Sequence, residues 1–183
     1  MVFIDLEKAY DRVPRDVLWW ALMKKGISLR YIDLIKDMYD GAITNVRTSG
    51  GLSDSFPITI GLHQGSALSP FLFAIVMDEL TKNIQDEVPW CMLFADDIVL
   101  VDETKDGINS KLELWRDTLE SRGFRLSRSK TKYMKCKFSD TSWDDGETIK
   151  LDGQDIPRSE QFRYLGSIIQ CNGNINRDVT HRI

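Results

Sequence analysis

Three acidic side chains interrupt apolar segments of the sequence. Asp5 lies inside the apolar run 2–6, and Asp96 and Asp97 lie inside the run 91–101. Because an unpaired charge is costly to bury, such carboxylates usually need a cation or hydrogen-bond donors. Carboxylate oxygens are the ligands that Mg²⁺ prefers, and two ions about 4 Å apart can activate a hydroxyl and stabilise a leaving oxygen in phosphoryl transfer. The pattern therefore indicates a two-metal site if the two segments are neighbours in the fold.

The same residues also have an ordinary structural explanation. Adjacent aspartates are common at hairpin bends because their side chains stabilise turns. Asp96-Asp97 alone therefore favours a simple turn, whereas Asp5 inside a predicted strand makes the metal site an equal alternative. Both interpretations stay open on these residues alone.

The apolar pattern predicts the helices that must help to position these acids. Apolar residues recur at intervals of four, three and four from Ile108 to Leu119, which is typical of an amphipathic helix, and Gly123 is a natural end for it. Ser28 is a candidate N-cap for another helix. Helices are expected at residues 14–26, 28–41, 69–84 and 108–123, and from residue 176 onward.

Strands are predicted between and after these helices. They are expected at residues 2–6, 42–48 and 55–60, on both sides of a bend within 90–101, and at 124–126, 133–138, 149–151 and 161–169. Asp152-Gly153 marks a hairpin turn after residue 151. This order of elements predicts an α+β domain in which helices back an antiparallel sheet.

Length and charge limit the function classes. A chain of 183 residues is typical of one domain, and its net charge of −4 argues against a general affinity for phosphates. Residues 122–138, however, contain seven basic side chains and no acidic one. This basic stretch is either a solvated surface or a nucleic-acid-binding segment.

Cysteine content and hydropathy predict an intracellular protein. Cys91, Cys136 and Cys171 are far apart and odd in number, so they match neither a zinc spacing nor a disulfide framework, and buried thiols are expected. A membrane span needs roughly 18 apolar residues without charges, and the sequence contains no such run. Nor does the N-terminus resemble a signal peptide.

Five segments resemble, in order, the motifs of the reverse transcriptase palm in LINE-type (non-long-terminal-repeat) retrotransposons. They are residues 3–11 (FIDLEKAYD), 64–73 (QGSALSPFLF), 94–97 (FADD), 123–131 (GFRLSRSKT) and 162–166 (FRYLG). Each segment is short enough to occur by chance, and their shared order across the chain carries the resemblance. One departure is Ser127, which stands where many members of the family carry asparagine.

The resemblance implies roles for the three aspartates and for Leu6 and Lys130. Asp5 and Asp96 are expected to bind two Mg²⁺ ions, with Mn²⁺ as the alternative, and the carbonyl of Leu6 is expected to add a ligand. Asp97 matches the second acid of the family's aspartate box and is expected to assist. Lys130 is expected to protonate the leaving pyrophosphate or to contact a phosphate.

It also implies a primer site and a nucleotide site, and Leu6 is expected to belong to the nucleotide site as well. Tyr10 matches the bulky residue that rejects a 2′-hydroxyl, although a core aromatic is a comparable explanation without the family. Gln64 is expected to hydrogen-bond the nucleotide, and Gly65 to let the backbone approach it closely. The primer-grip hairpin is expected to consist of Phe162, Tyr164, Leu165 and Gly166.

The resemblance implies a reverse-transcriptase palm with the fingers and thumb largely missing. Residues 1–171 correspond to the palm and residues 172–183 to the truncated start of a thumb helix. The implied function is RNA-directed DNA synthesis by a retrotransposon polymerase in the nucleus or cytoplasm, on an RNA template with a DNA primer and dNTPs. This fragment is expected to have little activity alone. The alternatives are a silent relic or domesticated module that binds RNA or a partner through the basic stretch, and a palm that performs another nucleotidyl transfer.

Overall fold

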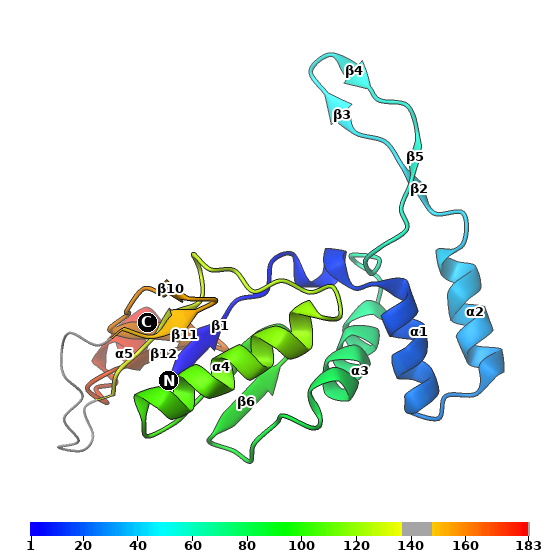
Figure 1. The fold of residues 1–183 in the computed structure, drawn as a ribbon. Coiled ribbons are helices and arrows are strands. Elements are labelled where there is room, and N and C mark those ends of the chain that lie inside the picture. Colours follow the sequence, from blue (N-terminus) through cyan, green and yellow to red (C-terminus); the bar gives the residue numbers. More distant parts are fainter. Residues whose placement is uncertain (137–147, 183) are drawn as a thin grey trace. The chain divides into compact units, whose positions relative to one another are not determined.

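The computed structural model describes residues 1–136 and 148–182, and its contacts divide the chain into two compact units. The first unit consists of Met1–Glu7 and Asn83–Ile183, and the second of Lys8–Lys82. The sequence predicts one domain, so this division is an additional level of organisation. Each unit is described by itself (Figure 1).

A four-stranded antiparallel sheet is the centre of the first unit. Its strands are, in spatial order, β6 (Cys91–Phe94), β7 (Asp97–Leu100), β1 (Val2–Ile4) and β8 (Lys132–Tyr133). All three residues of β1 are buried, as expected for a central strand with an apolar sequence. Phe3 pairs with Val99 of β7 on one side and with Lys132 of β8 on the other.

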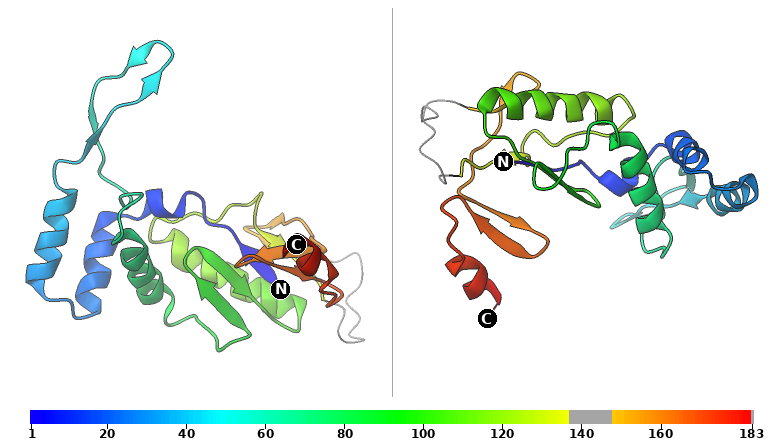
Figure 2. Two further views of the ribbon diagram at one scale, coloured as in Figure 1. Left: turned by 180° about the vertical axis from the view of Figure 1, so that it is seen from behind. Right: turned by 90° about the horizontal axis from the view of Figure 1, so that it is seen from below.

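The two faces of this sheet are covered by different elements. On one face, Phe3, Val99 and Met134 form a cluster with side chains of the hairpin β11 (Gln161–Tyr164) and β12 (Ser167–Gln170). The right-hand view of Figure 2 shows helix α4 (Lys105–Glu120) on the side of the sheet opposite this hairpin. The predicted antiparallel sheet backed by a helix is confirmed.

Helix α4 has the apolar face that its sequence predicts. Ile108, Leu112, Trp115 and Leu119 are all buried. At its start, the Thr104 hydroxyl accepts a hydrogen bond of 3.0 Å from the backbone N–H of Gly107, which is the usual way in which threonine caps a helix.

Short elements complete the first unit. They are β9 (Lys150–Leu151), β10 (Gln154–Asp155) and α5 (Asn176–Arg182). Asp152 and Gly153 both have positive φ in the β9–β10 turn, which confirms the predicted hairpin. The expected strands at 124–126 and 133–138 are shorter than predicted, because only a bridge at Leu126 and the two residues of β8 pair. Residues 137 and 138 lie outside the described part of the chain.

The prediction of a single strand over residues 161–169 is wrong. The chain turns at Leu165 (φ 49°) and Gly166 (φ 84°), so this segment is the two-stranded hairpin β11–β12. The first turn residue is the apolar Leu165, and the pattern of apolar residues therefore does not reveal where the first strand ends.

Helices form most of the second unit. They are η1 (Ala9–Arg12, a 3₁₀ helix), α1 (Arg15–Lys24), α2 (Leu29–Tyr39) and α3 (Ser69–Thr81). Helix α1 packs against both α2 and α3, and Leu18 and Leu22 of α1 are almost fully buried. Ser28 occupies the predicted N-cap position of α2, but within the described structure its side chain makes no capping hydrogen bond. Its role as a side-chain cap is therefore not confirmed.

An extended hairpin projects from these helices within the second unit (Figure 1). Its paired segments are β2 (Ile43–Thr44) with β5 (Phe56–Pro57), and β3 (Arg47–Thr48) with β4 (Gly51–Leu52). The loose hairpin expected around residues 42–60 is confirmed. Every residue of this hairpin from Ser53 to Ile60 is exposed, so the hairpin adds little to the core of the unit.

Two further features bear on the predictions from composition. Cys91 is a buried thiol, whereas Cys136 and Cys171 are only half-buried. Within the described residues, no helix combines the length and apolar character that crossing a bilayer requires.

Candidate active site

The strand register brings the three aspartates to one end of the sheet in the first unit. Ile4 of β1 lies opposite Ile98 of β7. Asp5 directly follows β1 and Asp97 begins β7. In this antiparallel pair the two acids therefore lie at the same end of the sheet. Asp96 belongs to the tight β6–β7 turn. The two acidic segments are therefore neighbours, which is the condition under which the sequence pattern indicates a two-metal site.

These carboxylates influence one another electrostatically. Burial raises the pKa of Asp5, the charge of nearby Asp96 raises it further, and the Lys130 ammonium partly opposes this. Burial likewise raises the pKa of Asp97, with added contributions from the charges of Asp96 and Asp5. A cation beside them therefore stabilises the ionised form of both carboxyl groups.

The aspartates suit an ion that takes only part of its coordination from protein. Among the described residues, no three acidic, histidine or cysteine side chains are close enough to hold a metal ion together. Mg²⁺ is commonly held by one or two carboxylates, with waters and substrate phosphates completing the shell. The side chain of Asp5 is 43% exposed, which leaves room for such ligands. The acids therefore fit an ion that arrives with a phosphate substrate.

The backbone beside Asp5 is paired with the segment that contains Lys130. The backbone N–H of Ser127 donates to the carbonyl of Asp5 at 2.8 Å, and that of Glu7 donates to the carbonyl of Arg125 at 2.9 Å. Leu6 lies between these two bonds, opposite Leu126, and neither bond uses the carbonyl oxygen of Leu6. That oxygen is compatible with the predicted ligand role.

Lys130 lies close to Asp5. Its Nζ is 3.9 Å from Oδ1 of Asp5, and its side chain is 73% exposed. Ser127, the departure from the family pattern, accepts a 3.2 Å hydrogen bond on its hydroxyl from the backbone N–H of Lys130. The hydroxyl of fully buried Thr131 accepts one of 3.3 Å from the backbone N–H of Asp5. Sequence reasoning missed the roles of both hydroxyls. The contact between Thr131 and Asp5 spans 126 residues and leaves no periodic pattern in the sequence.

The predicted primer-grip hairpin belongs to the same unit. The ring of Phe162 stacks on that of Phe3, with centroids 3.7 Å apart and planes at 20°. Burial raises the pKa of Tyr164, and the charge of Asp97 adds to this effect, so this side of the hairpin is within electrostatic reach of the aspartate turn. Leu165 at the tip is 53% exposed. The hairpin thus has a packed base and an accessible tip.

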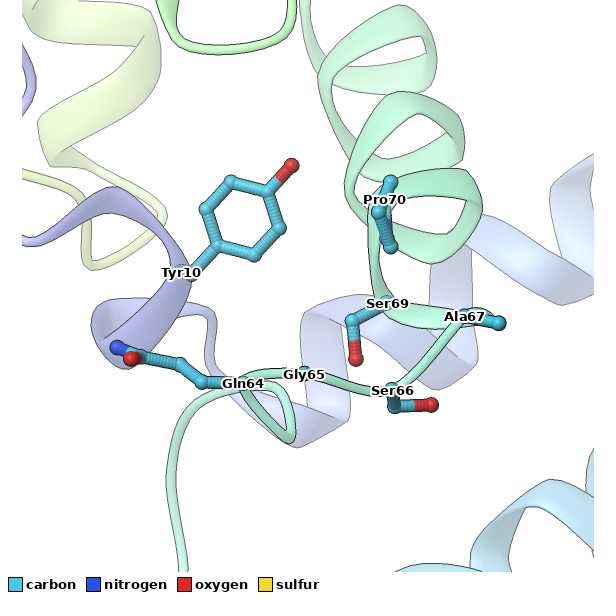
Figure 3. Close-up of a pocket in the computed structure, with 7 residues that line it drawn as sticks. All are labelled: Tyr10, Gln64, Gly65, Ser66, Ala67, Ser69 and Pro70. Carbon is cyan, nitrogen blue, oxygen red and sulfur yellow. The ribbon is translucent and has the colours of Figure 1, made fainter.

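The three predicted nucleotide-site residues of the second unit line one pocket. It has a volume of about 430 Å³. The lining residues are Tyr10, Gln64, Gly65, Ser66, Ala67, Ser69 and Pro70 (Figure 3). Segments far apart in the sequence, η1 and the loop before α3, therefore converge as the motifs predict.

Local contacts fix the walls of this pocket. The Tyr10 ring stacks on buried Phe73 with centroids 4.5 Å apart and planes at 12°. Tyr10 is only half-buried, so it is both a packing residue and a wall of the pocket. Nε2 of Gln64 donates to Oδ1 of Asp11 at 2.6 Å, a partner that sequence reasoning missed. Gly65 has φ 83°, and no described atom lies within 4 Å of the Cβ that a larger residue would add, so its backbone conformation is what favours glycine.

The predicted site residues therefore form two groups. Asp5, Leu6, Asp96, Asp97, Lys130 and the hairpin residues belong to the first unit, whereas Tyr10, Gln64 and Gly65 belong to the second. Each group is assembled within its own unit by the contacts described above.

Sequence comparison places the chain among retroelement polymerases. The family model described as reverse transcriptase (RNA-dependent DNA polymerase) matches residues 1–169. The retrovirus-related Pol polyprotein from the type-2 retrotransposable element R2DM of Drosophila melanogaster is 26% identical over 94% of this chain and 18% of its own length. An R2 Pol polyprotein of Popillia japonica is 28% identical over 96% of this chain and 29% of its own length. The RNA-directed DNA polymerase from mobile element jockey of D. melanogaster is 21% identical over 98% of this chain and 20% of its own length.

Solved structures show a similar fold. Telomerase from Candida albicans matches 95% of this chain and 29% of its own chain, with a TM-score of 0.62 and 14% identity. Apo telomerase from Candida tropicalis matches 98% of this chain and 33% of its own, with a TM-score of 0.62 and 15% identity. The predicted fold class is thereby confirmed.

Proposed function

The chain belongs to the reverse transcriptase (RNA-dependent DNA polymerase) family, and we propose that it is the palm portion of the RNA-directed DNA polymerase of a non-long-terminal-repeat retrotransposon. The resemblance seen in its motifs is confirmed by the R2 and jockey relatives. The chain spans 18% and 29% of the length of the two R2 proteins compared above. The observation that carries the proposal is the register of β1 and β7, which places Asp5 and Asp97 at the same end of the sheet. Lys130 lies beside Asp5 at this end.

The proposed reaction is nucleotidyl transfer. The 3′-hydroxyl of a DNA primer attacks the α-phosphorus of a dNTP selected by an RNA template, and pyrophosphate leaves. Two Mg²⁺ ions, or Mn²⁺ in their place, supply activation of the hydroxyl and charge stabilisation when bound. Asp5, Asp96 and the Leu6 carbonyl are the proposed ligands, and Asp97 assists. Lys130 holds its ammonium at the same edge, where it donates a proton to the leaving pyrophosphate or binds a phosphate oxygen.

The pocket in the second unit supports a role in nucleotide selection. We propose that the Tyr10 ring crowds a 2′-hydroxyl, because stacking on Phe73 restricts its movement. An amide nitrogen carries two N–H groups, so Gln64 keeps one donor and its oxygen for the nucleotide while the other N–H binds Asp11. The open backbone at Gly65 allows close approach of a sugar or phosphate.

The remaining assignments are also proposals. We assign residues 1–171 to the palm, residues 172–183 to the start of a thumb helix, and the site of action to the nucleus or cytoplasm. The β11–β12 hairpin would position the primer end through Phe162, Tyr164, Leu165 and Gly166. In α5, Asp178 accepts a hydrogen bond of 2.7 Å from the backbone N–H of Ile168, which supports a helix that continues from the hairpin.

The alternative of a module that binds RNA through the basic stretch has less support. Arg128 of this stretch is paired with Glu120 and Asp152. Lys137 lies outside the described residues. A basic residue that is already neutralised contributes little to binding of phosphates.

Primer extension tests the proposed function. The purified chain is incubated with an RNA template, a DNA primer, dNTPs and Mg²⁺, and Asp96→Asn is the matched variant because it removes charge and keeps shape. We expect weak extension that the variant loses. The same pair is then compared with fingers and thumb segments of an R2 protein fused on, where extension should increase. Extension that survives in Asp96→Asn, or its absence from both fused proteins, would contradict the proposal.

A further inference from the structure

Arg128 is held by carboxylates from two different elements of the first unit. Its guanidinium binds both oxygens of Glu120, the last residue of α4, with Nη2 3.1 Å from Oε2. The same Nη2 lies 3.2 Å from Oδ2 of Asp152 in the β9–β10 turn. A two-pronged contact between guanidinium and carboxylate fixes direction as well as distance. Arg128 is therefore an anchored residue within a stretch that its sequence would suggest is solvated.

Glu120 also holds the backbone next to Arg128. Its Oε1 accepts a hydrogen bond of 3.2 Å from the backbone N–H of Leu126, whose carbonyl accepts one of 2.8 Å from Arg128. The Glu120 side chain is only 20% exposed. Burial alone would raise the pKa of Glu120, but the hydrogen bonds from Arg128 and Leu126 outweigh it and hold the pKa below its ordinary value. Glu120 thus stays ionised and keeps its contacts at neutral pH.

The segment from Leu126 to Arg128, which Glu120 holds, leads directly to Lys130. The N–H of Lys130 is bound to the hydroxyl of Ser127, and the N–H of Ser127 is bound to the carbonyl of Asp5. An exposed ion pair is worth little by itself. Because the Lys130 side chain is 73% exposed, few contacts hold its ammonium, and the position of its backbone sets the range that the flexible side chain can reach.

We propose that Glu120, acting through Arg128, is a positioning residue that keeps Lys130 beside Asp5. The inference rests on the proposed function, in which Lys130 serves the reacting phosphates. If Glu120 loses its charge, the turn at residues 127–131 keeps its bonds to the strand of Asp5 but is released from α4. A displacement of roughly 1 Å can reduce a rate about 100-fold, so a partial release should be measurable.

The position of Lys130 can be followed in the purified chain without any activity. Lysines are reductively methylated with ¹³C, and the Lys130 resonance is identified by its absence in Lys130→Arg. The variant Asp5→Asn gives the chemical shift that methylated Lys130 has when the neighbouring carboxylate is absent. We expect Glu120→Gln to move the chemical shift of Lys130 towards the value seen in Asp5→Asn. Asp117→Asn, on the same helix and paired with Arg116, should leave it unchanged.

Two results would overturn the inference. One is a Lys130 resonance that stays at its native position in folded Glu120→Gln, and the other is a resonance that does not respond to Asp5→Asn. Arg128→Lys keeps the positive charge but loses the two-pronged contact. It should give a smaller shift in the same direction, and it replaces Glu120→Gln if circular dichroism shows that variant to be unfolded.

A double-mutant cycle in the primer-extension reaction separates positioning from a general loss of stability. Glu120→Gln should lower kcat about ten-fold, a part of what general acids usually contribute, and leave KM unchanged. Added to Lys130→Met it should cause no further loss, because the residue it positions is already absent. Additive losses would overturn the inference and leave the proposed function standing. A Lys130→Met variant with native kcat would overturn the proposed role of Lys130 and the inference with it.

Discussion

Asp5 donates its backbone N–H to the hydroxyl oxygen of Thr131, 3.3 Å away and fully buried. This hydrogen bond joins the end of strand β1, which carries Asp5, to the segment that carries Lys130, at the end of the sheet where the chemistry is proposed. The hydroxyl of Thr131 provides this link.

Replacing Thr131 by valine tests this link. The side chain keeps its shape, but the N–H of Asp5 loses its acceptor, and an unsatisfied buried donor costs about 1–3 kcal/mol. We expect a fall of about this size in the free energy of unfolding, measured by urea titration, together with lower primer-extension activity. Thr131→Ser, which keeps the hydroxyl, should retain more of the activity. If Thr131→Ser instead lost more activity than Thr131→Val, packing of the methyl group would be the important feature.

The raised pKa values of Asp5 and Asp97 predict how metal affects stability. Burial is the main cause for each, and the charge of Asp96 adds to both. The folded chain therefore binds these protons more tightly than the unfolded chain. Without metal, these groups lower the free energy of unfolding as pH rises from the ordinary value of 3.8 through the raised values.

A divalent cation should reverse this effect at neutral pH. Mg²⁺ at 100 times its Kd should stabilise the chain by about 2.7 kcal/mol, seen as a rise in Tm by calorimetry. Asp96→Asn should raise Tm in EDTA, because it removes a repelling charge, and should reduce the effect of Mg²⁺. Asp54→Asn, an exposed position in the hairpin of the second unit, removes the same charge and should respond like the native chain. An equal Mg²⁺ effect in Asp96→Asn would contradict the proposed ligand role.

Local patterns predicted the elements well where each element carries its own signal. The spacing from Ile108 to Leu119 predicts α4, and Asp152-Gly153 predicts the β9–β10 turn, because helix periodicity and positive φ depend on neighbouring residues. The turn at Leu165 breaks that rule, because a bulky apolar residue with φ 49° is unusual at a turn. There, only the resemblance to the primer-grip motif predicted a hairpin.

The sequence motifs propose the residues of the candidate site, but they do not predict the contacts between these residues. Asp5, Asp96 and Lys130 belong to recognisable motifs. The contacts that hold them, such as Thr131 with Asp5 or Glu120 with Arg128, join residues that are distant in the chain or separated by a helix end. Such pairs follow from tertiary packing, and no spacing in one sequence reveals them.

Tyr10 should control which sugar is accepted. Tyr10→Ala removes a ring that lines the pocket and stacks on Phe73, so the 2′-hydroxyl of a ribonucleotide would meet less crowding. We expect the preference for dNTPs over rNTPs, taken as the ratio of kcat/KM values, to fall on the order of ten-fold. This ratio does not depend on the fraction of folded protein. Tyr10→Phe keeps the ring and should keep the preference, and an unchanged ratio in Tyr10→Ala would favour the core explanation of this residue.

The contact between Glu120 and Arg128 should also appear in the response of stability to acid. Burial raises the pKa of Glu120, but hydrogen bonds from Arg128 and Leu126 outweigh it, so the net pKa lies below the ordinary 4.5. The unfolded chain then binds this proton more tightly. The stabilisation is therefore complete above about pH 4.5 and is lost as pH falls through the lowered pKa.

Glu120→Gln removes this titration and one charged partner of Arg128. We expect it to lower the free energy of unfolding at pH 7 by about 2 kcal/mol, the usual value for hydrogen bonds to charged groups. The native chain should lose this advantage over the variant as the solution is acidified, in urea titrations repeated from pH 7 to about pH 3. Asp117→Asn, whose carboxylate is 69% exposed, should change stability far less. A difference between native and Glu120→Gln that stayed constant with pH would show that shape, rather than the charge of Glu120, holds this segment to α4.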